Sequence, residues 1–126
     1  MTPAIPDDVE MVRHRGYREA RYLGAYALVR YKKQMELSVR ACEEKGAKLL
    51  LVDIRSLTGF NPTIQERFEF GRYGAEISGK LDRVSVLGTS EQIPPEAFAT
   101  LVARNRGLKI RAFIDRKAAV EWLLNG

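Results

Sequence analysis

The fold is decided by the stretch Leu49-Leu50-Leu51-Val52-Asp53-Ile54-Arg55, which continues as Ser56-Leu57-Thr58-Gly59-Phe60-Asn61-Pro62-Thr63. Consecutive apolar residues that end in an acid and then a Gly, Asn and Pro turn predict a strand buried on both faces. The loop after this strand leads to the start of a helix. In open α/β sheets, ligands and partners are met at the carboxyl ends of such strands. The stretch therefore predicts where the protein works.

The segments on either side of this strand alternate between strand and helix patterns. Upstream, they predict an edge hairpin made of strands 9–13 and 18–23, and a long amphipathic helix over 26–45. Downstream, they predict a helix that begins near 61–63, a strand at 83–88, a helix opened by Pro94 or Pro95 and ended by Gly107, a strand at 110–114 and a helix at 117–124. For the helix after the central strand, we expect Asn61 as the cap and Pro62 as the first helical residue.

The resulting order, β-β-α-β-α-β-α-β-α, predicts a single α/β domain over residues 1–126. Its sheet should be mostly parallel, with about five strands and with helices packed on it. A length of 126 residues with 45% hydrophobic and 29% charged residues is typical of a soluble globular domain. The start of the chain has no secretory pattern, and no apolar stretch is long enough to cross a bilayer. Cys42 is the only cysteine, so we expect a reducing, cytoplasmic compartment.

The net charge of +5 and the pI of 9.6 do not by themselves indicate nucleic-acid binding. The basic residues are scattered and mixed with acids, and no nucleic-acid motif is present, so we expect a solvated surface rather than a nucleic-acid interface. The early arginines and Lys32-Lys33 could still form a face that weakly attracts anions.

No catalytic constellation stands out. His14 is the only histidine and lies between two arginines, which indicates an exposed residue at a strand end without a partner acid. Cys42 falls on the inward stripe of the long helix, as a buried thiol does. Gly71 and Gly74 lie within a predicted helix and favour close packing rather than phosphate binding. We therefore expect a protein without metal or cofactor that is not an enzyme, with Asp53 acting as a base as a weaker alternative.

Polar residues should gather where the central strand and its neighbour end. Asp53 either ties the next turn through loop amides, which we favour because an unpaired buried charge is costly, or faces a ligand. The other polar residues expected at this ligand or partner edge are Arg55, Thr58, Asn61, Thr63, Thr89 and Ser90. Hydroxyls, amides and helix N-termini suit a small anion or a phosphorylated partner. The same groups also build ordinary turns and caps.

The helix after the central strand carries more aromatic residues than one inward face needs: Phe60, Phe68, Phe70 and Tyr73. Two apolar stripes on one helix indicate two partners, of which the sheet is one. The second is predicted to be a homodimer contact or an apolar ligand, unless neighbouring helices cover both stripes.

The element order, the strand ending in Asp53 and the Gly59-Phe60 loop resemble the SpoIIAA-like family. The closing pattern Phe113-x-Asp115-x-x-x-Ala119-x-x-Trp122-Leu123, preceded by Asn105-Arg106-Gly107, adds to the resemblance. That family is related to the STAS domains of anti-sigma-factor antagonists and sulphate transporters, and in shape to the CRAL-TRIO lipid-transfer fold. The phosphorylatable serine of the antagonists follows an Asp, and no Asp-Ser pair is present here. The phosphorylation switch is therefore not carried over, and Thr58 and Thr63 are the nearest hydroxyls.

Together these features predict a non-enzymatic regulatory module that binds a protein partner or a small anionic or apolar ligand, as a homodimer. The alternative is a carrier of a small hydrophobic or lipid-like molecule. That alternative requires an apolar cavity of some hundreds of cubic ångströms between the helices and the sheet.

Overall fold

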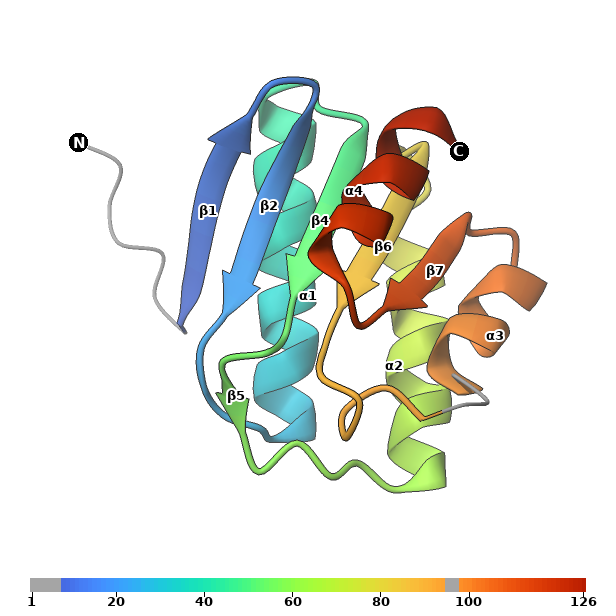
Figure 1. Cartoon of the computed structure of the whole chain (residues 1–126). Helices are drawn as coiled ribbons and strands as arrows, with labels where there is room; N and C mark the ends of the chain where they lie inside the picture. Colours follow the sequence, from blue (N-terminus) through green and yellow to red (C-terminus); the bar gives the residue numbers. More distant parts are fainter. Residues whose placement is uncertain (1–7, 95–97) are drawn as a thin grey trace.

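A five-stranded sheet forms the centre of the molecule (Figure 1). The computed structural model describes residues 8–94 and 98–126. In spatial order the strands are β1 (Val9–His14), β2 (Tyr17–Tyr22), β4 (Leu49–Asp53), β6 (Arg83–Leu87) and β7 (Ile110–Phe113). The β1–β2 pair is antiparallel and the other neighbours are parallel, which confirms the predicted, mostly parallel sheet of about five strands.

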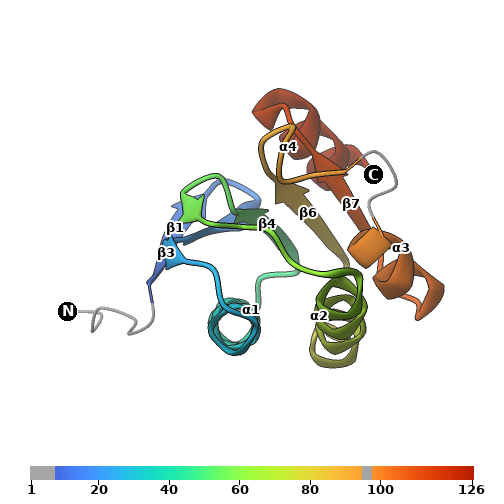
Figure 2. The same ribbon diagram turned by 90° about the horizontal axis from the view of Figure 1, so that it is seen from below.

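The helices cover the two faces of the sheet unequally. Figure 2 shows α1 (Leu28–Glu44), α2 (Ile64–Ile77) and α3 (Phe98–Asn105) on one side and α4 (Arg116–Asn125) on the other. The described residues also form a two-stranded parallel sheet, β3 (Gly24–Ala25) with β5 (Leu57–Thr58), which was not predicted. It joins the loop after β2 to the loop after β4.

The central strand β4 is buried on both faces, as predicted. Leu50 and Val52 face α1 and α2 in the larger core. Leu51 faces α4 in a smaller core that includes Leu87 and Leu123. Leu50 and Leu51 have 1% and 0% of their surface exposed. Because successive side chains of a strand point to opposite faces of the sheet, β4 contributes residues to both cores.

The predicted cap of α2 was wrong. Thr63, not Asn61, caps this helix: its Oγ1 accepts a hydrogen bond from the Glu66 amide, and the Glu66 carboxylate accepts one from the Thr63 amide, both at 3.0 Å. Two reciprocal bonds satisfy two free donors at the helix start, which the Asn61-Pro62 pair cannot do. Pro62 therefore lies before the helix. The described part of α3 begins at Phe98, so the predicted start of this helix at Pro95 is not tested. Pro94 precedes it outside any helix, and Pro95 lies outside the described residues.

Candidate functional site

The parallel strands bring the predicted polar residues to one end of the sheet. In Figure 1, β2, β4, β6 and β7 all end at the lower edge, where β5 and the loop after β6 also lie. Asp53 is the last residue of β4, and Thr89 and Ser90 follow β6 closely. Arg55, Thr58, Asn61 and Thr63 lie along the chain that leaves β4 at the same edge.

Asp53 ties the turn that follows its own strand. Its side chain is 8% exposed, and its Oδ1 accepts hydrogen bonds from the Arg55 amide and from Arg55 Nε, both at 3.0 Å. Its Oδ2 accepts from Arg55 Nη2 at 3.0 Å, and Arg116 Nη2 lies 3.6 Å away. Both oxygens thus already have donors within the chain. This arrangement supports the favoured structural role over that of a base.

The hydroxyls at this edge also serve turns and caps. Thr58 Oγ1 donates to the Gly24 carbonyl at 3.4 Å, and Thr63 caps α2. Thr89 exchanges two hydrogen bonds with Gln92: its Oγ1 accepts from the Gln92 amide at 3.2 Å, and its amide donates to Gln92 Oε1 at 2.9 Å. Ser90 and Asn61 are exposed. The polar side chains at this edge of the sheet therefore serve mainly to hold the loops and helix starts in place.

Three of the four aromatic residues predicted to contact a partner pack within the chain instead. Phe70 is buried, and Phe60 packs on Tyr26 at a ring-centroid distance of 5.0 Å. Tyr73 is half-buried and donates to Glu36 Oε2 at 3.0 Å. Phe60, Phe70 and Tyr73 therefore do not form an exposed dimer face, because α1 and the loop before it cover them. Phe68 remains 42% exposed.

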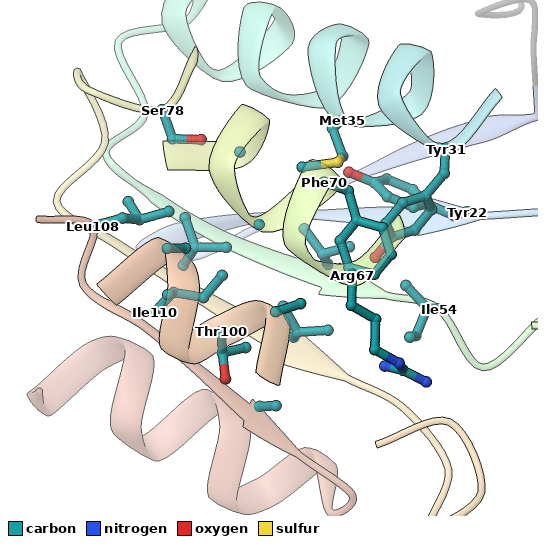
Figure 3. Close-up of a pocket in the computed structure, with 18 of the residues that line it drawn as sticks. Tyr22, Tyr31, Met35, Ile54, Arg67, Phe70, Ser78, Thr100, Leu108 and Ile110 are labelled. Atoms are coloured by element: carbon teal, nitrogen blue, oxygen red, sulfur yellow. The ribbon is translucent and has the colours of Figure 1, made fainter. Parts of the chain in front are cut away.

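An apolar pocket lies between the sheet and the three helices α1, α2 and α3, on the face of the larger core (Figure 3). Its volume is about 90 Å³. One end lies at the carboxyl edge of the sheet, beside Ile54, and the other lies beside Ser78 and Leu108. The remaining walls include Tyr31, Met35, Phe60, Arg67, Phe70, Gly71, Val84, Val86, Ile93, Ala103 and Ile110. The predicted apolar ligand contact of Phe60 and Phe70 is therefore sterically available.

The pocket lies where the carrier hypothesis placed a cavity, but it is smaller than that hypothesis required. A cavity of about 90 Å³ falls below the ~300–1,000 Å³ typical of ligand pockets, so it cannot enclose a lipid in this conformation. Close helix packing explains the small volume. A Cβ atom on Gly71 would lie 2.5 Å from the Ala99 carbonyl oxygen of α3, and one on Gly74 would lie 2.8 Å from Met35 Cε of α1. The prediction that these glycines permit close packing is thus confirmed.

A buried ionic cluster on the α4 side of the sheet was not predicted from the sequence. We call Glu19, Arg116, Arg21 and His14 the Glu19 cluster. Glu19 is fully buried, and Arg116 binds its two carboxylate oxygens at 3.0 and 2.7 Å. Arg21 Nε lies 2.9 Å from Oε2, and His14 Nε2 lies 2.7 Å from Oε1.

His14 therefore differs from the prediction of an exposed residue without a partner acid. It is bonded to Glu19, and its ring stacks on Tyr17 at 4.5 Å. The described residues contain no group of three His, Cys, Asp or Glu that could hold a metal ion. They also contain no helix that is long and apolar enough to span a membrane.

The strand order, the antiparallel edge hairpin and the placement of the helices define a SpoIIAA-like α/β fold. A solved structure with this fold is similar to the chain: an uncharacterised protein of the DUF3478 family from Shewanella loihica PV-4. The two share 21% sequence identity and a TM-score of 0.56, and the match covers 91% of each chain. At this identity the similarity shows the fold, and it confirms the predicted SpoIIAA-like architecture. No protein-family model and no curated protein matches the sequence.

Proposed function

We propose that this protein is a non-enzymatic binding module whose site is the apolar pocket under α1, α2 and α3. The observation that carries the proposal is the position of the pocket. It runs from the carboxyl edge of the sheet, where α/β proteins meet their ligands, into the larger core. The polar residues at that edge are engaged in turns and caps, so we assign recognition to the apolar walls rather than to Asp53 or the threonines.

The volume of the pocket sets the size of the group that it can take. An engineered apolar cavity of about 150 Å³ stays dry and binds benzene or xenon. By proportion, a pocket of about 90 Å³ suits an apolar group of roughly four carbon atoms, or one xenon atom. The proposed site is thus that of a small-molecule sensor or regulatory module rather than of a lipid carrier.

Xenon binding followed by ¹H–¹⁵N NMR tests this proposal. We expect xenon under pressure to shift the amide signals of residues that line the pocket and to leave the α4 side of the sheet unchanged. Val86 projects from β6 into the pocket, so Val86→Phe should fill the space and reduce these shifts several-fold. Val12→Phe makes the same change on the opposite face, outside the pocket, and should leave xenon binding intact.

Two outcomes would contradict this proposal. If xenon shifted mainly the amide signals of residues on the outer helix surfaces, the pocket would be too tightly packed to admit it. Equal shifts in the wild type and in a folded Val86→Phe variant would show that xenon binds elsewhere.

The predicted homodimer is a second candidate function, which exposed apolar side chains on α2 and α3 favour. Ile64 and Phe68 lie one turn apart on α2 and are 74% and 42% exposed, and Leu101 on α3 is 46% exposed. We expect a dimer in sedimentation velocity that Phe68→Asp converts to monomer. Val29 on α1 is 82% exposed, so Val29→Asp is the matched control and should leave the dimer intact. A wild-type protein that stays monomeric at high micromolar concentration would refute the homodimer.

A further inference from the structure

One end of the apolar pocket carries two polar groups. Figure 3 shows Tyr31, Phe70, Ile54 and Arg67 together at this end, away from Ser78 and Leu108. Tyr31 comes from α1 and Arg67 from α2, so the two side chains approach the pocket from different helices. The Arg67 guanidinium lies 5.7 Å from the centroid of the Phe60 ring, which forms part of the same wall.

Arg67 has no anionic partner among the residues that the structure describes. Within residues 8–94 and 98–126 its guanidinium makes no ion pair and no hydrogen bond, and its contact is with the face of Phe60. The neighbouring carboxylate of Glu66 is held in the capping box by the Thr63 amide at 3.0 Å. It also accepts a hydrogen bond from the Tyr26 hydroxyl at 3.4 Å. A half-buried arginine beside an apolar cavity thus keeps its donors free.

Tyr31 offers the second free donor. Tyr31 is 6% exposed. Its ring packs against the rings of Phe60 and Phe70, at centroid distances of 5.6 and 4.8 Å. Among the described residues its hydroxyl has no hydrogen-bond partner. Burial raises the pKa of Tyr31, Tyr26 raises it further, and the charge of Arg67 lowers it. The hydroxyl therefore stays protonated at neutral pH and can donate. Among the described residues, Ser85 Oγ is the buried side-chain atom left without a partner, so the Tyr31 hydroxyl reaches accessible space, where a ligand oxygen can accept from it.

We infer that the pocket binds a small aliphatic carboxylate, with the carboxylate at Arg67 and Tyr31 and a branched chain of about four carbons against Phe70. This inference rests on the proposed function and names its ligand class. A guanidinium offers two parallel donors that match a carboxylate, and the tyrosine hydroxyl offers a third. The cation lies at one end of the cavity and the apolar walls lie behind it, so the site fits a molecule with one charged end.

Isovalerate and 3-methylbutanol, titrated into the full chain at pH 7 and followed by ¹H–¹⁵N NMR, test the inference. The two probes share a carbon skeleton and differ in charge. We expect isovalerate to bind at least tenfold more tightly, as hydrogen bonds to a charged group imply. Tyr31→Phe and Arg67→Gln should each weaken isovalerate about tenfold and leave 3-methylbutanol unchanged. Arg104 is exposed on α3, so Arg104→Gln removes one positive charge away from the pocket and should change neither affinity.

The outcomes separate this inference from the proposed function. If xenon and 3-methylbutanol enter the pocket and isovalerate binds no better, the carboxylate class is wrong and the apolar site remains. If none of the three binds there, both ideas fail. If Arg104→Gln weakens isovalerate as much as Arg67→Gln does, the attraction comes from net charge and the assignment to Arg67 is overturned. The comparison of the two probes on the wild type decides the matter even if a variant does not fold.

Discussion

Replacing Glu19 by alanine is expected to lower the free energy of unfolding by about 3 kcal/mol, because it removes one partner from a buried ion cluster. Glu19 is 0% exposed and is held by Arg116, Arg21 and His14 at distances of 2.7 to 3.0 Å. Without the carboxylate, three basic groups would converge on an apolar gap beside the smaller core. Urea denaturation followed by circular dichroism measures the change.

Glu10→Ala is the matched control for the Glu19 variant. Glu10 pairs with Arg21 at 3.0 Å from the neighbouring strand, but its side chain is 54% exposed. Exposed ion pairs contribute little, so its loss should change the free energy of unfolding by no more than about 0.5 kcal/mol. If the Glu19 and Glu10 variants proved equally stable, the Glu19 cluster would have no special structural role.

The same cluster predicts a pH dependence. Burial alone would raise the pKa of Glu19, but hydrogen bonds from Arg116, Arg21 and His14 outweigh burial and lower it from 4.5 to about 2. The folded carboxylate thus binds a proton less readily than the unfolded one. Its stabilising contribution is complete above pH 4.5 and is lost as the pH falls from 4.5 towards 2. The stability difference between the wild type and Glu19→Gln should therefore shrink across this window, and a constant difference would contradict the assignment.

Gly71→Ala is the second substitution with a large expected effect. The added Cβ would lie 2.5 Å from the Ala99 carbonyl oxygen and 3.2 Å from Val102 Cβ, so α3 must move away from α2. Alanine gains about 1 kcal/mol over glycine in helix propensity. Overpacking against backbone costs about 1–3 kcal/mol, so we expect a net loss of about 1 kcal/mol in urea denaturation.

Gly79→Ala provides the control for this variant. A Cβ atom at Gly79 would meet nothing within 4 Å, so the same chemical change should not lower stability. Because Gly71 also lines the pocket, the Gly71 variant should bind xenon differently from the wild type. A Gly71→Ala protein more stable than the wild type would mean that α3 does not pack on α2 at this distance.

The order of the elements could be predicted because it is encoded locally. The apolar run that ends at Asp53 and the helical stripes identify strands and helices by their period alone. The start of α2 was mistaken because two signals overlap there. Asn61-Pro62 and Thr63 with Glu66 are both capping patterns, and reciprocal hydrogen bonds decide between them. Strands β3 and β5 are two residues each, too short to show a period.

The sites were harder to predict than the fold. Glu19 and Arg116 are 97 positions apart, and nothing near either residue marks it as a partner of the other. The pocket is the space left by side chains from three helices and the sheet, so no single segment indicates its volume. The spacing of the aromatic residues in the sequence predicted a contact beyond the sheet, but only the packing shows that Phe70 faces inward and Phe68 outward.

The antiparallel hairpin at the start of the chain places β1 at the edge of the described sheet. Because β1 pairs only with β2 in the described sheet, its other side is an open edge of the kind that recruits strands from other chains. Charged side chains lie along it: Glu10 and Arg13 are both exposed. Such charges discourage a second sheet from docking, as they do in many native edge strands. The charges on β1 therefore act against the joining of two copies into one continuous sheet.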